Sequence, residues 1–343
     1  MNSQRDKRRE AQPKANVIKK GNDMFLCVNN EWFVYSVSSQ PLGSGAMGTV
    51  YLGRSCSTHE KVAIKRVNDT YSNLPAIRER ARLEASLLFR HRNLVEMIGY
   101  CECNPYNGPI FIISRLVSGI TLDDHVSLHL RNRPDFVEKI CHSVFPVMDA
   151  LEYLHAKNII HMDIKPSNIM IENGSNVRLM DLGIAFASHN NSGGSIPGSG
   201  YGSGLGGTPQ YAAPEQMNHG KEALVAVNKT TDIYELGMTL YELLAGNNPF
   251  DCPTIEETLE KQKHEILPAI PGVSEKVMSI ILKATEKEQK KRYQTVREFK
   301  SDLQQAIIVV IPWWERLLYN PYFIGGIIGI ILVLILLILT NIL

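Results

Sequence analysis

The sequence has little that would indicate a secretory leader, a disulfide framework or a strong charge bias. No apolar segment lies near the N-terminus, so we expect no signal peptide. Only six of the 343 residues are cysteine, so we expect reduced thiols rather than disulfide bonds in a chain of this size. Cys101 and Cys103 have no second cysteine pair nearby, which argues against a zinc site. The formal net charge of +1 gives no reason to expect nucleic acid as a partner.

Basic residues are nevertheless concentrated at the N-terminus. Residues 1–20 contain seven lysines or arginines against only Asp6 and Glu10. This composition is typical of a solvated segment, and we predict a basic, disordered arm over residues 1–24. Contact of the arm with anionic lipid is an alternative reading.

The C-terminal segment is long and apolar. Residues 322–343 are almost all Ile, Leu, Val and Gly, and no charged side chain follows Arg316. Because about 20 apolar residues cross a bilayer, we predict a transmembrane helix at 322–343 after a juxtamembrane segment at 306–321. We expect a single-pass C-terminal anchor in the membrane lipid, with the preceding part of the chain in the cytoplasm. Gly325 and Gly329 permit self-association of such helices, although glycine is common in membrane helices in any case.

Between these ends the sequence changes from β-rich to helix-rich near residue 117. Residues 25–35 are typical of two short strands around an Asn-Asn turn. Further β-favouring runs occur at 49–53, 61–67, 94–101 and 110–117, and helix-favouring segments at 76–90 and 135–157. We therefore predict an α+β fold with a β-rich lobe over 25–116 and a helical lobe over 117–305.

A glycine-rich segment lies near the start of the β-rich lobe. Residues 42–50 (Leu-Gly-Ser-Gly-Ala-Met-Gly-Thr-Val) contain the pattern G-x-G-x-x-G-x-V. Dinucleotide-binding folds use a similar pattern, but they need a helix that begins at the last glycine. Here the glycines run into a β-favouring segment, so we expect them in a hairpin. Backbone amides can approach phosphate oxygens closely in such a hairpin.

The next predicted strand carries a lysine that can serve the same phosphates. Lys65 follows Val-Ala-Ile and lies 17 residues after Gly48. Alternation places its side chain on the face of the sheet opposite the buried residues. Such a lysine needs an anionic partner, which we expect to be Glu84 on the following helix, with Glu79 as the alternative.

The strongest motif lies in the helical lobe, at residues 161–168 (His-Met-Asp-Ile-Lys-Pro-Ser-Asn), followed by residues 181–183 (Asp-Leu-Gly). Two short β-favouring runs between these motifs predict a ribbon that brings Asp163, Asn168 and Asp181 together. The three side chains supply a proton acceptor and hard oxygen ligands for Mg²⁺, which phosphoryl transfer requires. A capped surface turn would not account for all these positions.

Together these segments resemble the protein-kinase signature, and residues 207–215 (Gly-Thr-Pro-Gln-Tyr-Ala-Ala-Pro-Glu) resemble its A-P-E motif. The amino-acid sequence of that segment is most similar to the corresponding segment of bacterial Hanks-type serine/threonine kinases. Asp232 and Arg292 also resemble late family positions, and the family's counterpart of Arg292 pairs with the A-P-E glutamate, here Glu215. The resemblance implies a two-lobed kinase fold and an ATP-dependent serine/threonine protein kinase.

The resemblance assigns a role to each matching residue. It implies that Asp163 is the catalytic base and that Lys165 lies near the γ-phosphate of ATP. Asn168 and Asp181 would bind Mg²⁺, with Mn²⁺ as an alternative ion, and Lys65 would contact the α- and β-phosphates. The implied nucleotide site comprises Leu42, Gly43, Gly45, Gly48, Val50, Ala63, Lys65, Glu84, Ser114 and Leu116.

Three positions depart from the family pattern. Met162 replaces an arginine that in many relatives contacts a phosphorylated activation loop, so we do not expect that type of control here. Leu182 replaces the phenylalanine of the D-F-G motif, which conserves apolar character. Arg115 stands where an acidic hinge residue is common.

The function expected from these observations is that of a membrane-tethered kinase acting on protein substrates. Autophosphorylation would occur at Ser199, Ser203 or Thr208, in or beside a Gly/Ser-rich loop at 188–207. The alternative is a pseudokinase scaffold that binds nucleotide without phosphoryl transfer. The sequence favours activity because it retains the phosphate-binding lysine, the base and both metal ligands. A dinucleotide-dependent enzyme is disfavoured by the strand after the glycines.

Overall fold

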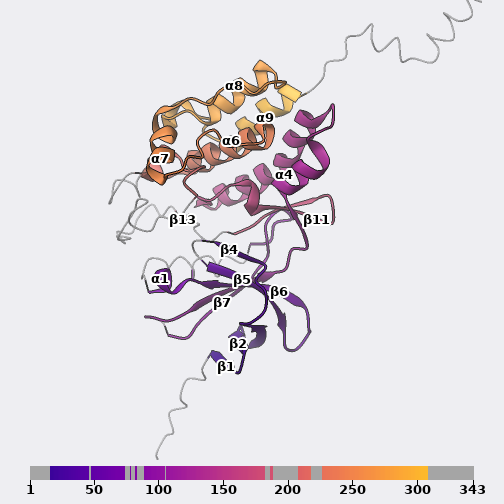
Figure 1. The fold of residues 1–343 in the computed structure, drawn as a ribbon, viewed down its shortest axis with the longest axis vertical. Coiled ribbons are helices and arrows are strands. Elements are labelled where there is room, and N and C mark those ends of the chain that lie inside the picture. Colours follow the sequence, from indigo (N-terminus) through magenta and orange to yellow (C-terminus); the bar gives the residue numbers. More distant parts are fainter. Residues whose placement is uncertain are drawn as a thin grey trace, which may run out of the picture.

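The computed structural model describes most of the chain between residues 16 and 307, with strands gathered in one lobe and helices in the other (Figure 1). The described residues are 16–45, 48–73, 78, 82, 89–104, 106–181, 186–187, 208–217 and 226–307. Within them, no helix combines the length and hydropathy needed to cross a bilayer. The predicted membrane helix at 322–343, most of the segment at 306–321 and the Gly/Ser-rich loop at 188–207 lie outside the described residues.

The first lobe is built on an antiparallel sheet with the strand order β1-β2-β3-β5-β6-β8-β7, in which β4 also pairs with β5. Its strands are β1 (Val17–Lys20), β2 (Asp23–Val28), β3 (Glu31–Ser36), β4 (Gly43–Gly45), β5 (Gly48–Ser55), β6 (Lys61–Val67), β7 (Met97–Glu102) and β8 (Ile110–Arg115). The four β-favouring runs predicted between 49 and 117 therefore form β5, β6, β7 and β8. The short helix α1 (Asp69–Ser72) follows β6. Most of the helix predicted at 76–90 lies outside the described residues.

The predicted hairpin at 25–35 is confirmed as the pair β2 and β3. Asn29 and Asn30 form its two-residue turn, with φ angles of 51° and 65°. Positive φ at both turn positions matches the right-handed twist of the flanking strands, and asparagine tolerates this conformation better than most residues.

The prediction of a disordered arm over residues 1–24 was wrong for its last part. Residues 17–20 form β1, which pairs with β2 through a turn at Gly21 and Asn22. This pairing uses main-chain hydrogen bonds, so the side chains of Lys19 and Lys20 remain exposed while the strand is ordered. Charge density alone therefore did not predict the state of this segment. Residues 1–15 lie outside the described residues.

The N-terminal strands also close the sheet against its far edge. Asn29 Nδ2 donates to the carbonyl oxygen of Ile98 on β7 at 3.2 Å, and Cys101 Sγ donates to the carbonyl oxygen of Asn16 at 3.5 Å. The strands enclose an apolar cluster, which we call the upper core. It consists of Leu26, Val28, Phe33, Tyr35, Val62, Ile64, Cys101, Phe111 and Ile113. The N-terminal strands thus cover one face of the sheet and leave the other face to the helical lobe.

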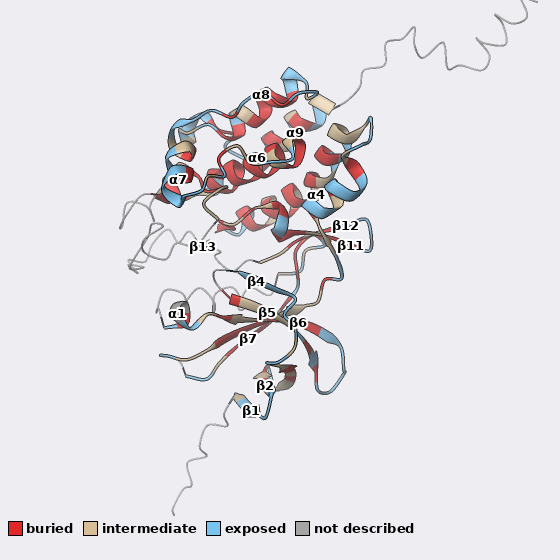
Figure 2. Ribbon diagram, viewed as in Figure 1, coloured by how far each residue is buried: buried red, intermediate tan, exposed pale blue. Residues whose placement is uncertain are grey.

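The second lobe packs helices around α6 (Lys229–Ala245), which is buried along most of its length (Figure 2). The other α-helices among the described residues of this lobe are α3 (Leu122–His125), α4 (Phe136–Ala156), α7 (Ile255–His264), α8 (Glu275–Ala284) and α9 (Val296–Ile307). The helix predicted at 135–157 is thereby confirmed as α4. Asn228 and Thr231 form a reciprocal cap at the start of α6, and Gly246, with φ of 87°, ends it.

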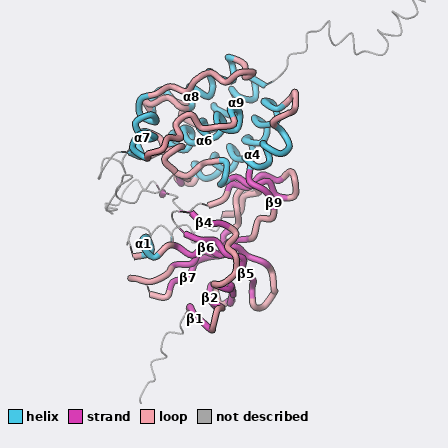
Figure 3. Tube along the Cα trace, in the orientation of Figure 1, coloured by secondary structure: helices cyan, strands magenta, loops and turns pink. Residues whose placement is uncertain are grey.

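Two small sheets lie between the lobes (Figure 3). One contains β9 (Gly119–Thr121), β11 (Ile169–Glu172) and β12 (Asn176–Leu179), and the other pairs β10 (Ile159–Ile160) with β13 (Phe186–Ala187). The ribbon predicted between the two motifs is the pair β11 and β12. The third strand β9 was not predicted. These strands position both motifs at the junction of the lobes.

Candidate active site

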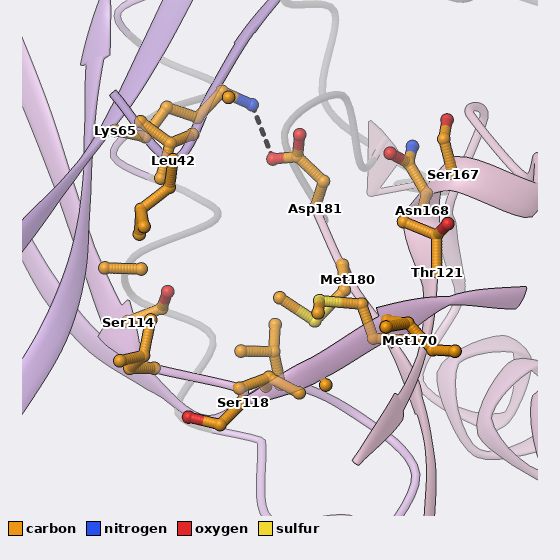
Figure 4. A pocket seen from close by; sticks show the side chains of 18 of the residues that line it. Leu42, Lys65, Ser114, Ser118, Thr121, Ser167, Asn168, Met170, Met180 and Asp181 are labelled. Atoms are coloured by element: carbon orange, nitrogen blue, oxygen red, sulfur yellow. Dashed lines mark hydrogen bonds and ion pairs between the residues drawn. The ribbon is translucent and has the colours of Figure 1, made fainter. Parts of the chain in front are cut away.

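A cavity of about 660 Å³ opens between the two lobes (Figure 4). Of the predicted nucleotide-binding residues, those that line it are Leu42, Gly43, Val50, Ala63, Lys65, Ser114 and Leu116. The predicted metal ligands Asn168 and Asp181 line the same cavity from the helical lobe. The structure therefore brings together residues that are more than 100 positions apart in the sequence.

The glycine-rich segment forms the predicted hairpin of β4 and β5, in which Gly45 is paired with Gly48. These two glycines are not part of the cavity lining. A Cβ atom on Gly48 would lie 2.4 Å from the carbonyl oxygen of Arg66 on β6. Real Cβ atoms essentially never come so close, so glycine is required here for the approach of β5 to β6.

Lys65 reaches across the cavity to Asp181, with its Nζ 2.5 Å from Oδ1 (Figure 4). Strand β6 directs Lys65 there because its alternate residues Val62 and Ile64 are buried in the upper core. Burial opposes the negative charge of Asp181, but the nearby Lys65 ammonium outweighs it and lowers the pKa of the carboxyl. An ionised carboxylate beside a cation suits a site for phosphates and a metal ion.

Three side chains orient the carboxylate of Asp163. Asn168 Nδ2 donates to Oδ2 at 2.8 Å, and Thr208 Oγ1 donates to Oδ1 at 2.9 Å. Lys165 Nζ lies 3.0 Å from Oδ2 and donates to the Thr208 hydroxyl at 2.5 Å. A carboxylate fixed in this way can accept a proton from a hydroxyl group brought beside it.

Asn168 connects this carboxylate to the candidate metal site. Its Nδ2 donates both to Oδ2 and to the main-chain carbonyl oxygen of Asp163, at 2.8 Å each. Because the amide nitrogen is engaged, the side-chain oxygen is the atom that Asn168 can offer to a cation. An amide oxygen and the Asp181 carboxylate are ligands that suit a hard ion such as Mg²⁺.

Two residues of the site have left-handed backbone conformations, Met162 with φ of 66° and Asp181 with φ of 55°. Such strain costs about 1–3 kcal/mol for a residue other than glycine and is common at functional sites. Asp232 on α6 stabilises the first of them, because its carboxylate accepts the main-chain N–H groups of His161 and Met162. The same carboxylate lies 2.6 Å from His155 Nε2.

Comparison with known proteins identifies the family. A family model described as the protein kinase domain matches residues 36–304, which is most of the chain. The chain belongs to the protein kinase family. The predicted resemblance is therefore confirmed, and with it the two-lobed kinase fold of the described residues.

Its curated relatives include bacterial serine/threonine-protein kinases. PknB of Mycobacterium tuberculosis is 33% identical over 269 residues, and the match covers 76% of this chain and 41% of PknB. PrkC of Bacillus subtilis is 30% identical over 277 residues, and the match covers 77% of this chain and 39% of PrkC. The kinase chain thus spans about two fifths of the length of these relatives.

The A-P-E segment of the kinase is anchored to the helical lobe as predicted. Arg292 forms two hydrogen bonds with the Glu215 carboxylate, at 2.7 and 2.8 Å, and both residues are buried. Burial opposes the charge of Glu215, but the hydrogen bonds and positive charge of Arg292 outweigh it and lower the pKa. Nearby, the Tyr211 hydroxyl donates to Glu242 of α6 at 2.5 Å.

The departures from the kinase pattern have structural counterparts. Met162 is fully buried, so an apolar residue suits its position. Arg115, at the end of β8, forms an ion pair of 2.7 Å with Glu172 of β11. Glu172 also accepts a hydrogen bond from Arg178 at 2.9 Å. Arg115 therefore connects the two lobes beside the cavity. Leu182 lies outside the described residues.

Some functional residues were not tested or were missed. Glu84 and Glu79, the candidate partners of Lys65, lie outside the described residues. Sequence reasoning missed the apolar lining of the cavity, which is supplied by Val95, Met97, Ile112, Val117, Met170 and Met180. Alternation along β7 and β8 was the available signal, since residues such as Ile112 face the cavity while neighbours such as Ile113 enter the upper core.

Proposed function

We propose that the protein transfers the γ-phosphate of ATP to serine and threonine hydroxyls of protein substrates. The observation that carries the proposal is the Asp163 carboxylate, oriented by Lys165, Thr208 and Asn168. The Asp163 carboxylate is hydrogen-bonded to Asn168, a candidate metal ligand. Asn168 lines the cavity that also contains the Lys65–Asp181 pair. This arrangement supports phosphoryl transfer, which depends mainly on positioning and on stabilisation of phosphate charge.

Each group has a defined task in this reaction. When bound, Mg²⁺ neutralises charge on the phosphates, and the oxygens of Asn168 and Asp181 would hold it, or Mn²⁺ in its place. Lys65 binds the α- and β-phosphates of ATP. Asp163 accepts the proton of the substrate hydroxyl, and Lys165 stabilises negative charge near the transferred phosphate.

The test is transfer of labelled γ-phosphate from Mg·ATP to the full chain and to a generic basic protein. We expect phosphoserine or phosphothreonine with the wild type, and a rate about 10²–10⁴-fold lower with Asp163→Asn or Lys65→Met. Lys61→Met, an exposed position on the same strand, is the matched control and should retain activity. ATP binding without any transfer by the wild type would favour the pseudokinase alternative.

The proposal includes a membrane tether at residues 322–343, which rests on their apolar sequence. The six cysteines are free thiols, in keeping with kinase lobes on the cytoplasmic side. The full chain should float with phospholipid vesicles in a density gradient, whereas a chain ending at Ile307 should remain at the bottom. Equal flotation of both chains would contradict the tether. Cross-linking of the full chain in vesicles would then test self-association through Gly325 and Gly329.

The proposal also includes autophosphorylation. We propose transfer between two tethered chains, and the Thr208 hydroxyl is held inside its own chain by Asp163 and Lys165. We therefore assign the acceptor role to Ser199 and Ser203, which lie outside the described residues. Mass spectrometry after incubation with Mg·ATP should find phosphate on these serines. The Gly/Ser-rich loop at 188–207 should carry no phosphate in Ser199→Ala/Ser203→Ala or in Asp163→Asn. Phosphate on Thr208 instead would contradict this assignment.

A further inference from the structure

The peptide unit that follows Asp163 is fixed at both of its ends by side chains. Its carbonyl oxygen, which belongs to Asp163, accepts from Asn168 Nδ2 at 2.8 Å. Its N–H group, which belongs to Ile164, donates to Glu235 Oε2 on α6 at 2.9 Å. One turn further along α6, Thr239 Oγ1 donates to the carbonyl oxygen of Ile164 at 3.0 Å. The orientation of this peptide sets the direction in which Asp163 leaves the main chain.

The second oxygen of Glu235 connects to the A-P-E segment. Gln216 Nε2 donates to Glu235 Oε1 at 2.9 Å, and Gln216 Oε1 accepts the main-chain N–H of Ala213 at 2.6 Å. A continuous chain of hydrogen bonds therefore runs from Ile164, beside Asp163, through two side chains to Ala213. We call this chain the 164–213 relay.

All four members of the relay are secluded from solvent. The exposed fractions of Glu235 and Gln216 are 1% and 2%, and Ile164 and Ala213 are fully buried. Burial, together with the nearby carboxylate of Asp232, raises the pKa of Glu235. A carboxyl group is energetically unfavourable at such a position, because desolvation opposes its charge. It does have one property that a carboxamide lacks, since both of its oxygens can accept a main-chain or side-chain N–H.

We propose that Glu235 is a positioning residue, which fixes the peptide after Asp163 and couples its position to that of the A-P-E segment through Gln216. The inference rests on the proposed phosphotransferase function, in which Asp163 is the base. Asp232 and Glu235 lie on the same helix and accept N–H groups from His161, Met162 and Ile164. Helix α6 thus supports the main chain on both sides of Asp163.

The donor and acceptor pattern of the relay supplies a specific test. In Glu235→Gln the new NH₂ group faces another N–H donor, either that of Ile164 or that of Gln216. Rotating either carboxamide by half a turn only moves this clash of two donors to the next hydrogen bond of the relay. In Gln216→Glu two carboxyl groups meet at the same joint, so one of them must take up a proton for a hydrogen bond to form there. The exchange variant Glu235→Gln/Gln216→Glu restores a donor facing an acceptor at every joint and keeps the composition unchanged.

We expect Glu235→Gln in the full chain to lower kcat at least about 10-fold, with KM for ATP within about twofold, because misalignment near the reacting atoms is costly. Gln216→Glu should lower kcat less, because a proton shared by two carboxyl groups restores its hydrogen bond. The exchange variant should recover kcat to within about threefold of the wild type. Thr285→Val is the matched control: its hydroxyl is a buried donor to Ile281 on α8, and it should lower Tm without lowering kcat. Assays run well below every Tm keep loss of folding out of the comparison.

A readout independent of catalysis separates this inference from the proposed function. Hydrogen exchange of the peptide that contains Ile164, followed by mass spectrometry, should accelerate in Glu235→Gln and return to the wild-type rate in the exchange variant. An unchanged rate of hydrogen exchange in this peptide, together with kcat within twofold in Glu235→Gln, would overturn the inference. So would a double variant Glu235→Gln/Gln216→Glu whose kcat is no higher than that of either single variant. An inactive wild type would refute the proposed function alone. The hydrogen-exchange measurement would then decide whether the 164–213 relay fixes this peptide.

Discussion

The upper core and the surroundings of α6 are both buried, but they are stabilised by different chemistry. The upper core consists of apolar side chains such as Leu26, Phe33 and Ile64. Helix α6 instead buries Asp232 and Glu235 and pairs them with main-chain N–H groups of residues 161–164. The upper core therefore gains its stability from area removed from water, whereas the α6 region depends on directed hydrogen bonds.

This difference predicts that stability and activity can be changed separately. An apolar core tolerates substitutions of similar shape and volume, because its interactions are not directional. A buried polar network does not, because removal of one partner leaves another without its hydrogen bond.

The largest effect is expected where a buried charge loses its partner. Arg292→Met leaves the Glu215 carboxylate buried without its two hydrogen bonds to arginine, although the Thr231 hydroxyl still donates to it. The free energy of unfolding should therefore fall by about 3–5 kcal/mol. Phosphate transfer should fall as well, because the A-P-E segment loses its anchor. Urea unfolding and the transfer assay measure the two effects. The double variant Glu215→Leu/Arg292→Met is the control, and it should regain much of the lost stability.

A large cavity in the upper core should cost stability alone. Phe33→Ala removes a side chain that is 2% exposed, and we expect a loss of about 3 kcal/mol. Because no residue of the cavity lining belongs to the upper core, kcat measured well below Tm should stay within about twofold. Phe33→Leu should be milder in the same unfolding assay. A 10-fold fall in kcat with Phe33→Ala would break the proposed separation of the regions.

The Glu215–Arg292 pair should also make stability depend on pH. The folded-state pKa of Glu215 is lowered, so its contribution is present above the ordinary value of 4.5 and is lost as pH falls through the folded pKa. One carboxyl group contributes a slope of up to about 1.4 kcal/mol per pH unit in that window. Urea unfolding of the wild type and Glu215→Gln between pH 3 and pH 7 should show the two curves converging in acid. Parallel curves would contradict the assignment.

The smallest effect is expected at the ion pair between the lobes. Arg115 is 39% exposed as a side chain, so its pair with Glu172 is screened by solvent. Arg115→Ala should change the free energy of unfolding by less than about 1 kcal/mol. Because the pair connects the lobes beside the cavity, KM for ATP should rise about two- to threefold while kcat is retained. Steady-state kinetics at two salt concentrations test this, since added salt should reduce the difference.

Much of the site could be predicted from the sequence because its signals are local. The glycines before a β-favouring run predicted the β4–β5 hairpin, and Asn29-Asn30 predicted the turn between β2 and β3. The spacing of residues 161–168 and 181–183 predicted that Asp163, Asn168 and Asp181 would meet. In each case a turn or a short ribbon fixes the geometry, so residues close in the sequence determine the outcome.

The remaining features were decided by contacts between distant segments. Charge density around Lys19 and Lys20 predicted disorder, but pairing of β1 with β2 orders this segment. The apolar lining of the cavity depends on which face of β7 and β8 the N-terminal strands cover. Glu235 carries no local sign of its role, because its partner Ile164 lies 71 residues away.

The sequence by itself therefore determined the family, the kinase motifs and most of the strands, since each follows from local spacing and turn chemistry. Only the tertiary structure decided how the first lobe is closed and how α6 supports Asp163. Those features arise when buried polar groups find partners across the fold, and a buried carboxyl such as Glu235 is accommodated only where another segment supplies its N–H donors.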